Sequence, residues 1–281
     1  MSAAGLSIGR ALQEGTERLR EVSGSARLDA ELLLAEILGV GRSHLFAFPE
    51  RPLPAEAVAA YQSLLARRAR GEPVAYLLQR CEFRDLDLTV SPAVLVPRPE
   101  TEHLVEQILA RLPAGGRLLE PGTGSGAIAL AVASERPDAR IIATERSAAA
   151  LRVAQANRQR LQLTSVELVA GDWNDGVPAG PFDVIASNPP YVETDAAEWA
   201  DGALAHEPRE ALVAGPDGLA AIRSLLPVAS AELARGGWLM LEHGARQGEA
   251  VRGLLAAAGL EAVYTERDLA NLERITLGRQ P

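Results

Sequence analysis

The first part of the chain carries apolar residues at helical spacing in three segments. Glycines follow the second segment and prolines precede the third, so each segment has a defined end. The segments are residues 6–20, 27–39 and 54–70. This pattern predicts a small all-helical domain over residues 1–80. No residues in it are arranged for chemistry, so by exclusion we expect it to recognise a partner or substrate.

The hydrophobic period changes after this domain. Residues 82–90 alternate between apolar and polar side chains, as in a strand or a hairpin. We therefore expect a hairpin or linker over residues 81–93 and a second domain over residues 94–281. The second domain opens with a helix that begins at Pro99 or Thr101, where a proline is tolerated and acidic residues are favourable.

Short apolar runs alternate with helical patterns through the rest of the chain. The expected strands are one that begins at Arg117, then 140–144, 165–170, 182–186 and 238–242, and a late pair at 262–267 and 272–277. Helices are expected after Ala127, up to Leu161, and over 218–234 and 247–258, with a turn at Gly236 and Gly237. Residues 192–210 are polar and irregular, typical of a loop that substrate orders. The alternation predicts an α/β fold, with a mostly parallel sheet that ends in an antiparallel pair.

A stiff polar loop follows the strand at residues 182–186. Its sequence is Asn188-Pro189-Pro190-Tyr191, and the two prolines cannot donate backbone hydrogen bonds. The Asn188 amide oxygen and the Pro189 carbonyl can accept both hydrogens of a planar –NH2 group, while the Tyr191 ring stacks on it. Such binding returns electron density to the nitrogen and aims it at an electrophile such as a sulfonium methyl group. The alternative is that this tetrapeptide is only a turn that ends the strand.

A glycine-rich loop lies between an apolar strand and a helix. Its residues are Gly122, Thr123, Gly124, Ser125 and Gly126. Glycines let a ligand approach the backbone, and the helix start presents free N–H groups. The loop also fits the dinucleotide pattern, so it does not distinguish NAD from S-adenosylmethionine. Glu145 ends the next strand, where it can accept both hydroxyls of a ribose.

Asp172 and Trp173 follow the strand at residues 165–170. The carboxylate can bind an adenine amino group, and the indole can cover the adenine ring. Alternatively, Trp173 only closes the core. All of these candidates lie at the carboxyl ends of expected parallel strands, which is where open α/β sheets bind ligands.

Composition narrows the class of protein. The chain has 281 residues, of which 47% are hydrophobic, and no apolar run is long enough to span a bilayer. Cys81 is the single cysteine, and the four histidines lack metal-ligand spacing, so we expect a cytoplasmic protein without a disulfide or a metal site. The net charge of −9 combines −10 on residues 81–281 with +1 on residues 1–80, and every cation is an arginine. An acidic domain argues against a nucleic-acid substrate.

The motifs together resemble the protein-(glutamine-N5) methyltransferases that modify peptide-chain release factors, the PrmC/HemK family. The resemblance covers nearly the whole chain. Its motifs are Gly71-Glu72-Pro73, Glu82-Phe83, Val96-Pro97-Arg98-Pro99-Glu100-Thr101-Glu102, Gly122–Gly126, Asp172-Trp173, Asn188–Tyr191, Glu207-Pro208, Asp217-Gly218-Leu219 and Leu241-Glu242. The Asn-Pro-Pro-Tyr motif is shared with adenine amino-methyltransferases, whereas the stretch around Arg98 is more specific.

The resemblance implies a class I methyltransferase fold and S-adenosyl-L-methionine as cofactor. It implies that residues 122–126, Glu145, Trp173 and Asn188 bind this cofactor. Asn188, Pro189, Pro190 and Tyr191 would hold the glutamine of a Gly-Gly-Gln loop in class I release factors, with Asn188, Pro189 and Tyr191 as the catalytic residues. The protein would be a monomer that binds neither nucleic acid nor membrane.

Two alternatives stay open at this point. One is an adenine-N6 or guanine-N2 methyltransferase of nucleic acids, and the other is a non-catalytic release-factor or ribosome-binding protein. The chain also departs from the family pattern, which favours Asp at Glu120 and Glu145, a leucine-like residue at Pro121 and an aromatic residue at His206. The sequence leaves the roles of Arg98, Glu100, His206 and Glu207 undecided.

Overall fold

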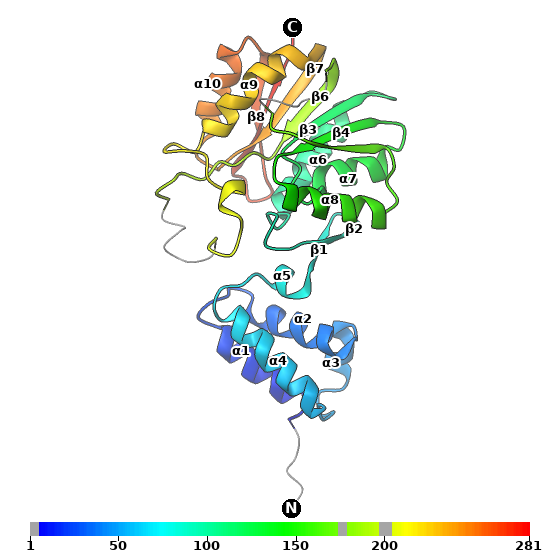
Figure 1. The fold of residues 1–281 in the computed structure, drawn as a ribbon. Coiled ribbons are helices and arrows are strands. Elements are labelled where there is room, and N and C mark those ends of the chain that lie inside the picture. The colour runs from blue at the N-terminus through cyan, green and yellow to red at the C-terminus, as the bar shows by residue number, and fades with distance from the viewer. Residues whose placement is uncertain (1–5, 174–178, 197–203) are drawn as a thin grey trace, which may run out of the picture. The chain divides into compact units, whose positions relative to one another are not determined.

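The computed structural model describes residues 6–173, 179–196 and 204–281, which divide into two compact units (Figure 1). The smaller unit contains the chain up to Gln79 together with residues 204–206. The larger unit contains the described residues between Arg80 and 196 and from Glu207 to Pro281. Across all described residues, no helix is both long enough and apolar enough to cross a membrane.

The smaller unit is helical. Its helices are α1 (Ile8–Leu19), α2 (Ala26–Leu38), α3 (Arg42–Ala47), α4 (Ala55–Arg68) and α5 (Val74–Leu78). They pack around Tyr61, whose hydroxyl donates to the carbonyl of Ala30. The prediction of three helices was incomplete, because the described chain also contains α3 and α5. These helices have six and five residues, too few turns for a helical period to show in the sequence.

The larger unit begins with the hairpin of β1 (Arg80–Phe83) and β2 (Leu86–Thr89), as the alternation predicted. A seven-stranded sheet follows, in the order β5-β4-β3-β6-β7-β9-β8. Its strands are β3 (Arg117–Pro121), β4 (Arg140–Glu145), β5 (Val166–Ala170), β6 (Phe182–Ser187), β7 (Leu233–Glu242), β8 (Glu261–Arg267) and β9 (Glu273–Arg279). The first five strands in this order are parallel, and β9 runs antiparallel to both of its neighbours. The predicted class I methyltransferase sheet is therefore confirmed.

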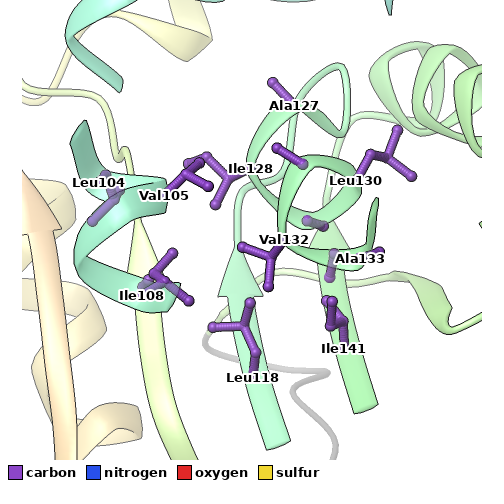
Figure 2. Close-up of a cluster of buried hydrophobic side chains, with 14 of the residues drawn as sticks. Leu104, Val105, Ile108, Leu118, Ala127, Ile128, Leu130, Val132, Ala133 and Ile141 are labelled. Atoms are coloured by element: carbon purple, nitrogen blue, oxygen red, sulfur yellow. The ribbon is translucent and has the colours of Figure 1, made fainter. Parts of the chain in front are cut away.

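Helices cover both faces of this sheet. They are α6 (Pro99–Arg111), α7 (Ala127–Glu135), α8 (Ala148–Arg160), α9 (Ala220–Glu232) and α10 (Gly248–Ala257). Figure 2 shows apolar side chains of α6 and α7 meeting Leu118 of β3 and Ile141 of β4. The neighbouring Leu119 belongs to the other core cluster, beneath α9 and α10, because successive strand residues point to opposite faces. Burial on both faces explains why these strands are continuous apolar runs.

The turn expected at Gly236 and Gly237 is wrong. Both glycines lie within β7, which begins at Leu233 and not at Trp238. Phe182 pairs with Leu233 but Val184 pairs with Trp238, so the extra residues of β7 form a bulge. Gly236 has a φ of +76°, which L-residues rarely adopt, and this made a bulge look like a turn in sequence.

The irregular stretch expected at residues 192–210 falls partly outside the described residues, which omit 197–203. The described flanks are held at both ends. Val192 pairs with Val213, and Arg209–Ala211 form a short 3-10 helix. Whether substrate orders this stretch stays a prediction.

The direction of winding reverses between β3 and β6. These strands are neighbours, with β4 and β5 on one side and β7 on the other. The loops that follow β3 and β6 therefore lie side by side at the carboxyl edge, where such sheets bind ligands. The Ser187 hydroxyl connects the strand ends by donating to the carbonyl of Pro121 at 2.7 Å.

Candidate active site

A cleft opens at this edge of the sheet, within the larger unit. It holds about 920 Å³ of empty space, part of it open to solvent. Nine of the residues predicted from sequence line it: Gly122, Thr123, Gly124, Ser125, Glu145, Asp172, Trp173, Asn188 and Pro190. Gly126, Pro189 and Tyr191 are not among its lining residues, so their contacts with a ligand stay predictions.

The glycine loop has a backbone that other residues would strain. Gly122, Gly124 and Gly126 have φ values of +75°, +56° and +86°. The backbone N–H groups of Gly122 and Thr123 both donate to the carbonyl of Thr144, at 2.9 and 3.0 Å. A Cβ atom on Gly122 would lie 3.1 Å from the Trp173 ring. The loop is therefore a narrow cradle whose inner surface is backbone.

Glu145 ends β4 beside this cradle. One carboxylate oxygen accepts from the N–H of Gly124 and the other from the N–H of Ser147, both at 2.9 Å. Each oxygen keeps a further lone pair, so the buried carboxylate can still accept from ligand hydroxyls in the cleft. The ribose role predicted for Glu145 fits this geometry.

Glu120 is a cleft residue that the sequence analysis did not assign to the site. It is 1% exposed, and one of its oxygens accepts from the Thr123 hydroxyl at 2.7 Å and from the Ala129 N–H at 2.9 Å. Burial raises its pKa to about 8, and the charge of Glu145 adds to the effect of burial. Its place at the end of a buried strand, just before the glycine loop, could have identified it.

Asp172 and Trp173 both face the cleft. The Asp172 carboxylate lies 3.9 Å from the Arg146 guanidinium. The Trp173 indole donates to the Ser224 hydroxyl at 3.2 Å and also packs against the core beneath α9. The two interpretations of Trp173 are therefore compatible, since its ring packs against the core and also borders the cradle at Gly122.

Asn188 presents an unusual buried oxygen. Its side-chain N–H donates to the Thr101 hydroxyl at 3.2 Å. Its side-chain oxygen is buried and has no hydrogen-bond partner among the described residues, although Asn188 lines the cleft. A buried acceptor without a partner is costly, about 1–3 kcal/mol, so this oxygen requires an explanation, and a donor on a ligand in the cleft would supply one.

Tyr191 is held by residues outside its own motif. Its hydroxyl donates to Glu242 at 3.5 Å, and the Gln247 side chain donates to its backbone carbonyl at 3.0 Å. Burial raises the Tyr191 pKa to about 12, which keeps the phenol protonated. Burial also raises the pKa of Glu242 to about 7, while hydrogen bonding from Thr101 and Tyr191 opposes that rise. The sequence analysis assigned no role to Thr101, Glu242 or Gln247.

The structure also gives positions to the four undecided residues. Glu207 is buried, forms an ion pair with Arg98, and accepts from the backbone N–H of Val96 at 3.1 Å. It thus fixes the segment whose Arg98 side chain lines the cleft. Glu100 is exposed. His206 belongs to the smaller unit, where its ring donates to the Arg70 carbonyl at 2.9 Å.

Within the described ranges, no three His, Cys, Asp or Glu side chains come together as metal ligands would. The chemistry that the described cleft itself offers is hydrogen-bond acceptance and charge. It has a backbone cradle, two buried carboxyl groups and one unpartnered amide oxygen, which suit a ribose-bearing ligand and a planar –NH2 group.

Comparisons with known proteins cover both units. A family described as the PrmC N-terminal domain matches residues 10–78, and the methyltransferase small domain matches residues 99–215. A release factor glutamine methyltransferase of Xylella fastidiosa (strain Temecula1) is 48% identical over 96% of this chain and 97% of that protein. Another protein of that name, from Escherichia coli (strain K12), is 46% identical over 95% of this chain and 97% of its own.

A solved structure supports the fold. The crystal structure of a methyltransferase from Pyrococcus furiosus matches with a TM-score of 0.55 at 22% identity, over 76% of this chain and 98% of that one.

Proposed function

Because this chain belongs to the family of release factor glutamine methyltransferases, we propose that it methylates the side-chain amide nitrogen of a glutamine in a peptide-chain release factor. The cofactor is S-adenosyl-L-methionine. The acceptor is the glutamine of the Gly-Gly-Gln loop in class I release factors. The enzyme acts in the cytoplasm as a monomer, and it does not take nucleic acid as a substrate.

One observation carries the choice of acceptor. The buried Asn188 oxygen lacks a partner among the described residues, and the Asn188 N–H is already used by Thr101. An acceptor placed in this way selects a donor, and a glutamine –NH2 group has two hydrogens to give. The Pro189 carbonyl accepts the second hydrogen, and Pro190 and Tyr191 bound the planar amide.

The residues of the cleft fit the cofactor. Gly122 and Gly124 have no side chains, so the cofactor can approach the backbone of the loop. Glu145 accepts from the ribose hydroxyls of the cofactor, and Asp172 and Trp173 bind its adenine. The cofactor supplies a methyl group on a positively charged sulfur, which is a strong electrophile. Asn188 and Pro189 orient the amide lone pair toward that methyl group, because both hydrogens of the amide are then bound elsewhere. The displaced amide proton leaves to solvent.

Methyl transfer to purified acceptors tests this function. The protein is incubated with tritium-labelled cofactor and, in parallel, with a recombinant bacterial release factor, duplex DNA or ribosomal RNA. We expect label in the release factor alone, on the glutamine of the Gly-Gly-Gln loop after digestion and mass spectrometry. Label in a purine of either nucleic acid would establish the amino-methyltransferase alternative. No transfer to any acceptor, with release-factor binding intact, would establish the non-catalytic alternative.

We further propose that the chain has three parts: a substrate-recognition domain over residues 1–80, a hairpin linker over 81–93 and a catalytic domain over 94–281.

In the smaller unit, Phe46 and Phe48 are 55% and 44% exposed, which is unusual for large apolar side chains and favours a contact surface. Replacing both with alanine should raise KM for the intact release factor about tenfold. Activity on a short Gly-Gly-Gln peptide should stay unchanged, and an equal loss on both substrates would refute this role.

A further inference from the structure

The loop Asn188–Tyr191, the acceptor loop, has two functional side chains, Asn188 and Tyr191, and the hydrogen bonds of both lead to the carboxyl group of Glu242. Tyr191 reaches Glu242 directly through its hydroxyl. Asn188 reaches it through Thr101, whose hydroxyl accepts from Asn188 at 3.2 Å and whose hydrogen bonding to the Glu242 carboxyl lowers the pKa of that group. We propose that Glu242 is a positioning residue that fixes Asn188 and Tyr191 together, and that Thr101 relays its effect to Asn188. This inference rests on the proposed function.

The direction of the hydrogen bonds explains how the relay works. The Thr101 oxygen accepts from the Asn188 N–H, so its single hydrogen is free to donate, and in its ionised form the Glu242 carboxylate can only accept. With its hydrogen turned toward Glu242, Thr101 offers Asn188 an acceptor only. The Asn188 amide must then place its nitrogen on Thr101 and its oxygen away from it. Glu242 thereby decides which end of the amide is left without a partner.

The acceptor loop cannot set this orientation by itself. Two of its four residues are prolines, which donate no backbone hydrogen bond. Its side-chain partners lie 87 residues away at Thr101 and 51 residues away at Glu242. Both partners are buried, Thr101 in the first turn of α6 and Glu242 at the end of β7.

Glu242 acts from outside the cleft. It is 1% exposed and does not belong to the described residues that line the cleft, whereas Thr101 and Asn188 do. Its second carboxyl oxygen is buried and accepts no hydrogen bond of good geometry from any described residue. The Glu242 carboxyl therefore has lone pairs left to accept hydrogen bonds. These lone pairs keep the hydroxyl hydrogens of both Thr101 and Tyr191 turned toward Glu242.

The variants Glu242→Gln, Thr101→Val, Thr101→Ser and Tyr191→Phe test the proposal with the full-length protein. Glu242→Gln presents an –NH2 group to one of the two hydroxyl groups, so we expect kcat on a recombinant release factor to fall about 10- to 100-fold. The dissociation constant for the cofactor should change less than about threefold, since Glu242 does not line the cleft. Thr101→Val should lower kcat similarly, and Thr101→Ser should restore most of the activity because it keeps the hydroxyl.

Combined variants separate positioning from general damage. If Glu242 acts through Thr101 and Tyr191, then adding Glu242→Gln to the Thr101→Val/Tyr191→Phe double variant should lower kcat no further. Full additivity would overturn the proposal. Thr276→Val is a matched control, since it removes another buried threonine hydroxyl, one that bonds to His243 and Thr265. It should lower the melting temperature and leave kcat unchanged.

A spectroscopic measurement tests the relay without activity. The chain has four asparagines, so selective 15N labelling gives four side-chain amide signals. The Asn188 signal should shift in Glu242→Gln as it does in Thr101→Val, although the Asn188 side chain bonds to Thr101 and not to Glu242. An unchanged Asn188 signal in folded Glu242→Gln would overturn the inference. If the unaltered protein fails to methylate the release factor, the proposed function fails, and this measurement still decides the relay separately.

Discussion

The loops that follow β3 and β6 lie side by side, yet they keep their shapes by opposite means. The loop after β3 uses glycines at positive φ, and its N–H groups bond to the adjacent strand β4. The loop after β6 uses prolines, and its Asn188 and Tyr191 side chains bond to α6 and β7, while the backbone carbonyl of Tyr191 accepts from Gln247, just before α10. The first loop offers backbone groups to a ligand, which suits a ligand that many proteins bind. The second loop offers side chains that are held by residues distant in the sequence, which suits one particular acceptor.

The largest effect on kcat is expected from a substitution in the second loop, at Asn188. Asn188→Ala removes the unpartnered acceptor and should lower kcat about 10²- to 10³-fold, the usual effect of losing one preorganised hydrogen-bonding group. Asn188→Asp keeps an acceptor and should retain more activity than the alanine variant. Steady-state kinetics with a release factor, and calorimetry for the cofactor, measure both effects. Full kcat in Asn188→Ala would mean that the loop is only a turn.

A smaller effect is expected when the first loop loses Glu145. Glu145→Ala leaves the N–H groups of Gly124 and Ser147 without their acceptors and removes the proposed ribose contact. The free energy of cofactor binding should weaken by about 1–3 kcal/mol. Isothermal titration calorimetry checks this value, and it should also show no binding of NAD. Tight NAD binding would contradict the cofactor assignment.

The raised pKa of Glu120, which lies beside the first loop, predicts that cofactor affinity depends on pH. Its pKa is raised to about 8, so at pH 7 the carboxyl of the free protein is mostly protonated. A cationic cofactor favours the ionised form, so binding below pH 8 releases a proton, and affinity should fall by up to about tenfold per pH unit below 8. Calorimetry in two buffers of different ionisation enthalpy counts the released proton. Glu120→Gln should flatten the profile, whereas a pH-independent affinity in the unaltered protein would contradict the prediction.

The smallest effect concerns the contact between the two loops. Ser187→Ala removes the donor to the Pro121 carbonyl and should lower the free energy of unfolding by about 1 kcal/mol. For a domain of this size that corresponds to roughly 2–4 °C in melting temperature, measurable by calorimetry. Ser134→Ala is a suitable control, since its hydroxyl bonds within α7 to Ala131. Equal losses of stability in both variants would show that this contact contributes no more than a hydroxyl bond within one helix.

The same contrast explains what the sequence could predict. The glycine loop was predictable because its constraints are local: three glycines, a strand before them and a helix after them. The sheet was predictable too, since continuous apolar runs reflect burial on both faces. Thr101 and Glu242 were not identified as partners of the acceptor loop, because a hydrogen bond across 87 or 51 residues leaves no periodic pattern. Glu242 does end a parallel strand, so the rule that found Glu145 could also have found it.

The predictions of secondary structure were wrong where the local sequence favours one conformation and tertiary packing stabilises another. Helices α3 and α5 form because the core around Tyr61 accepts them, although each is shorter than an isolated helix could be. The paired glycines in β7 suggested a turn, but pairing with β6 continues past the bulge.

The strand order also sets the order in which this sheet can be completed during folding. β9 is made after β8, yet it lies between β7 and β8. The outer edge of β7, which ends at Glu242, therefore has no pairing strand until residues 273–279 have been synthesised. An unpaired strand edge is a site for wrong association, so a nascent chain halted before β9 should be prone to aggregation. The Glu242 carboxyl group, which bonds to Tyr191, is thus fixed in place late, after the half of the sheet that carries the glycine loop can already have formed.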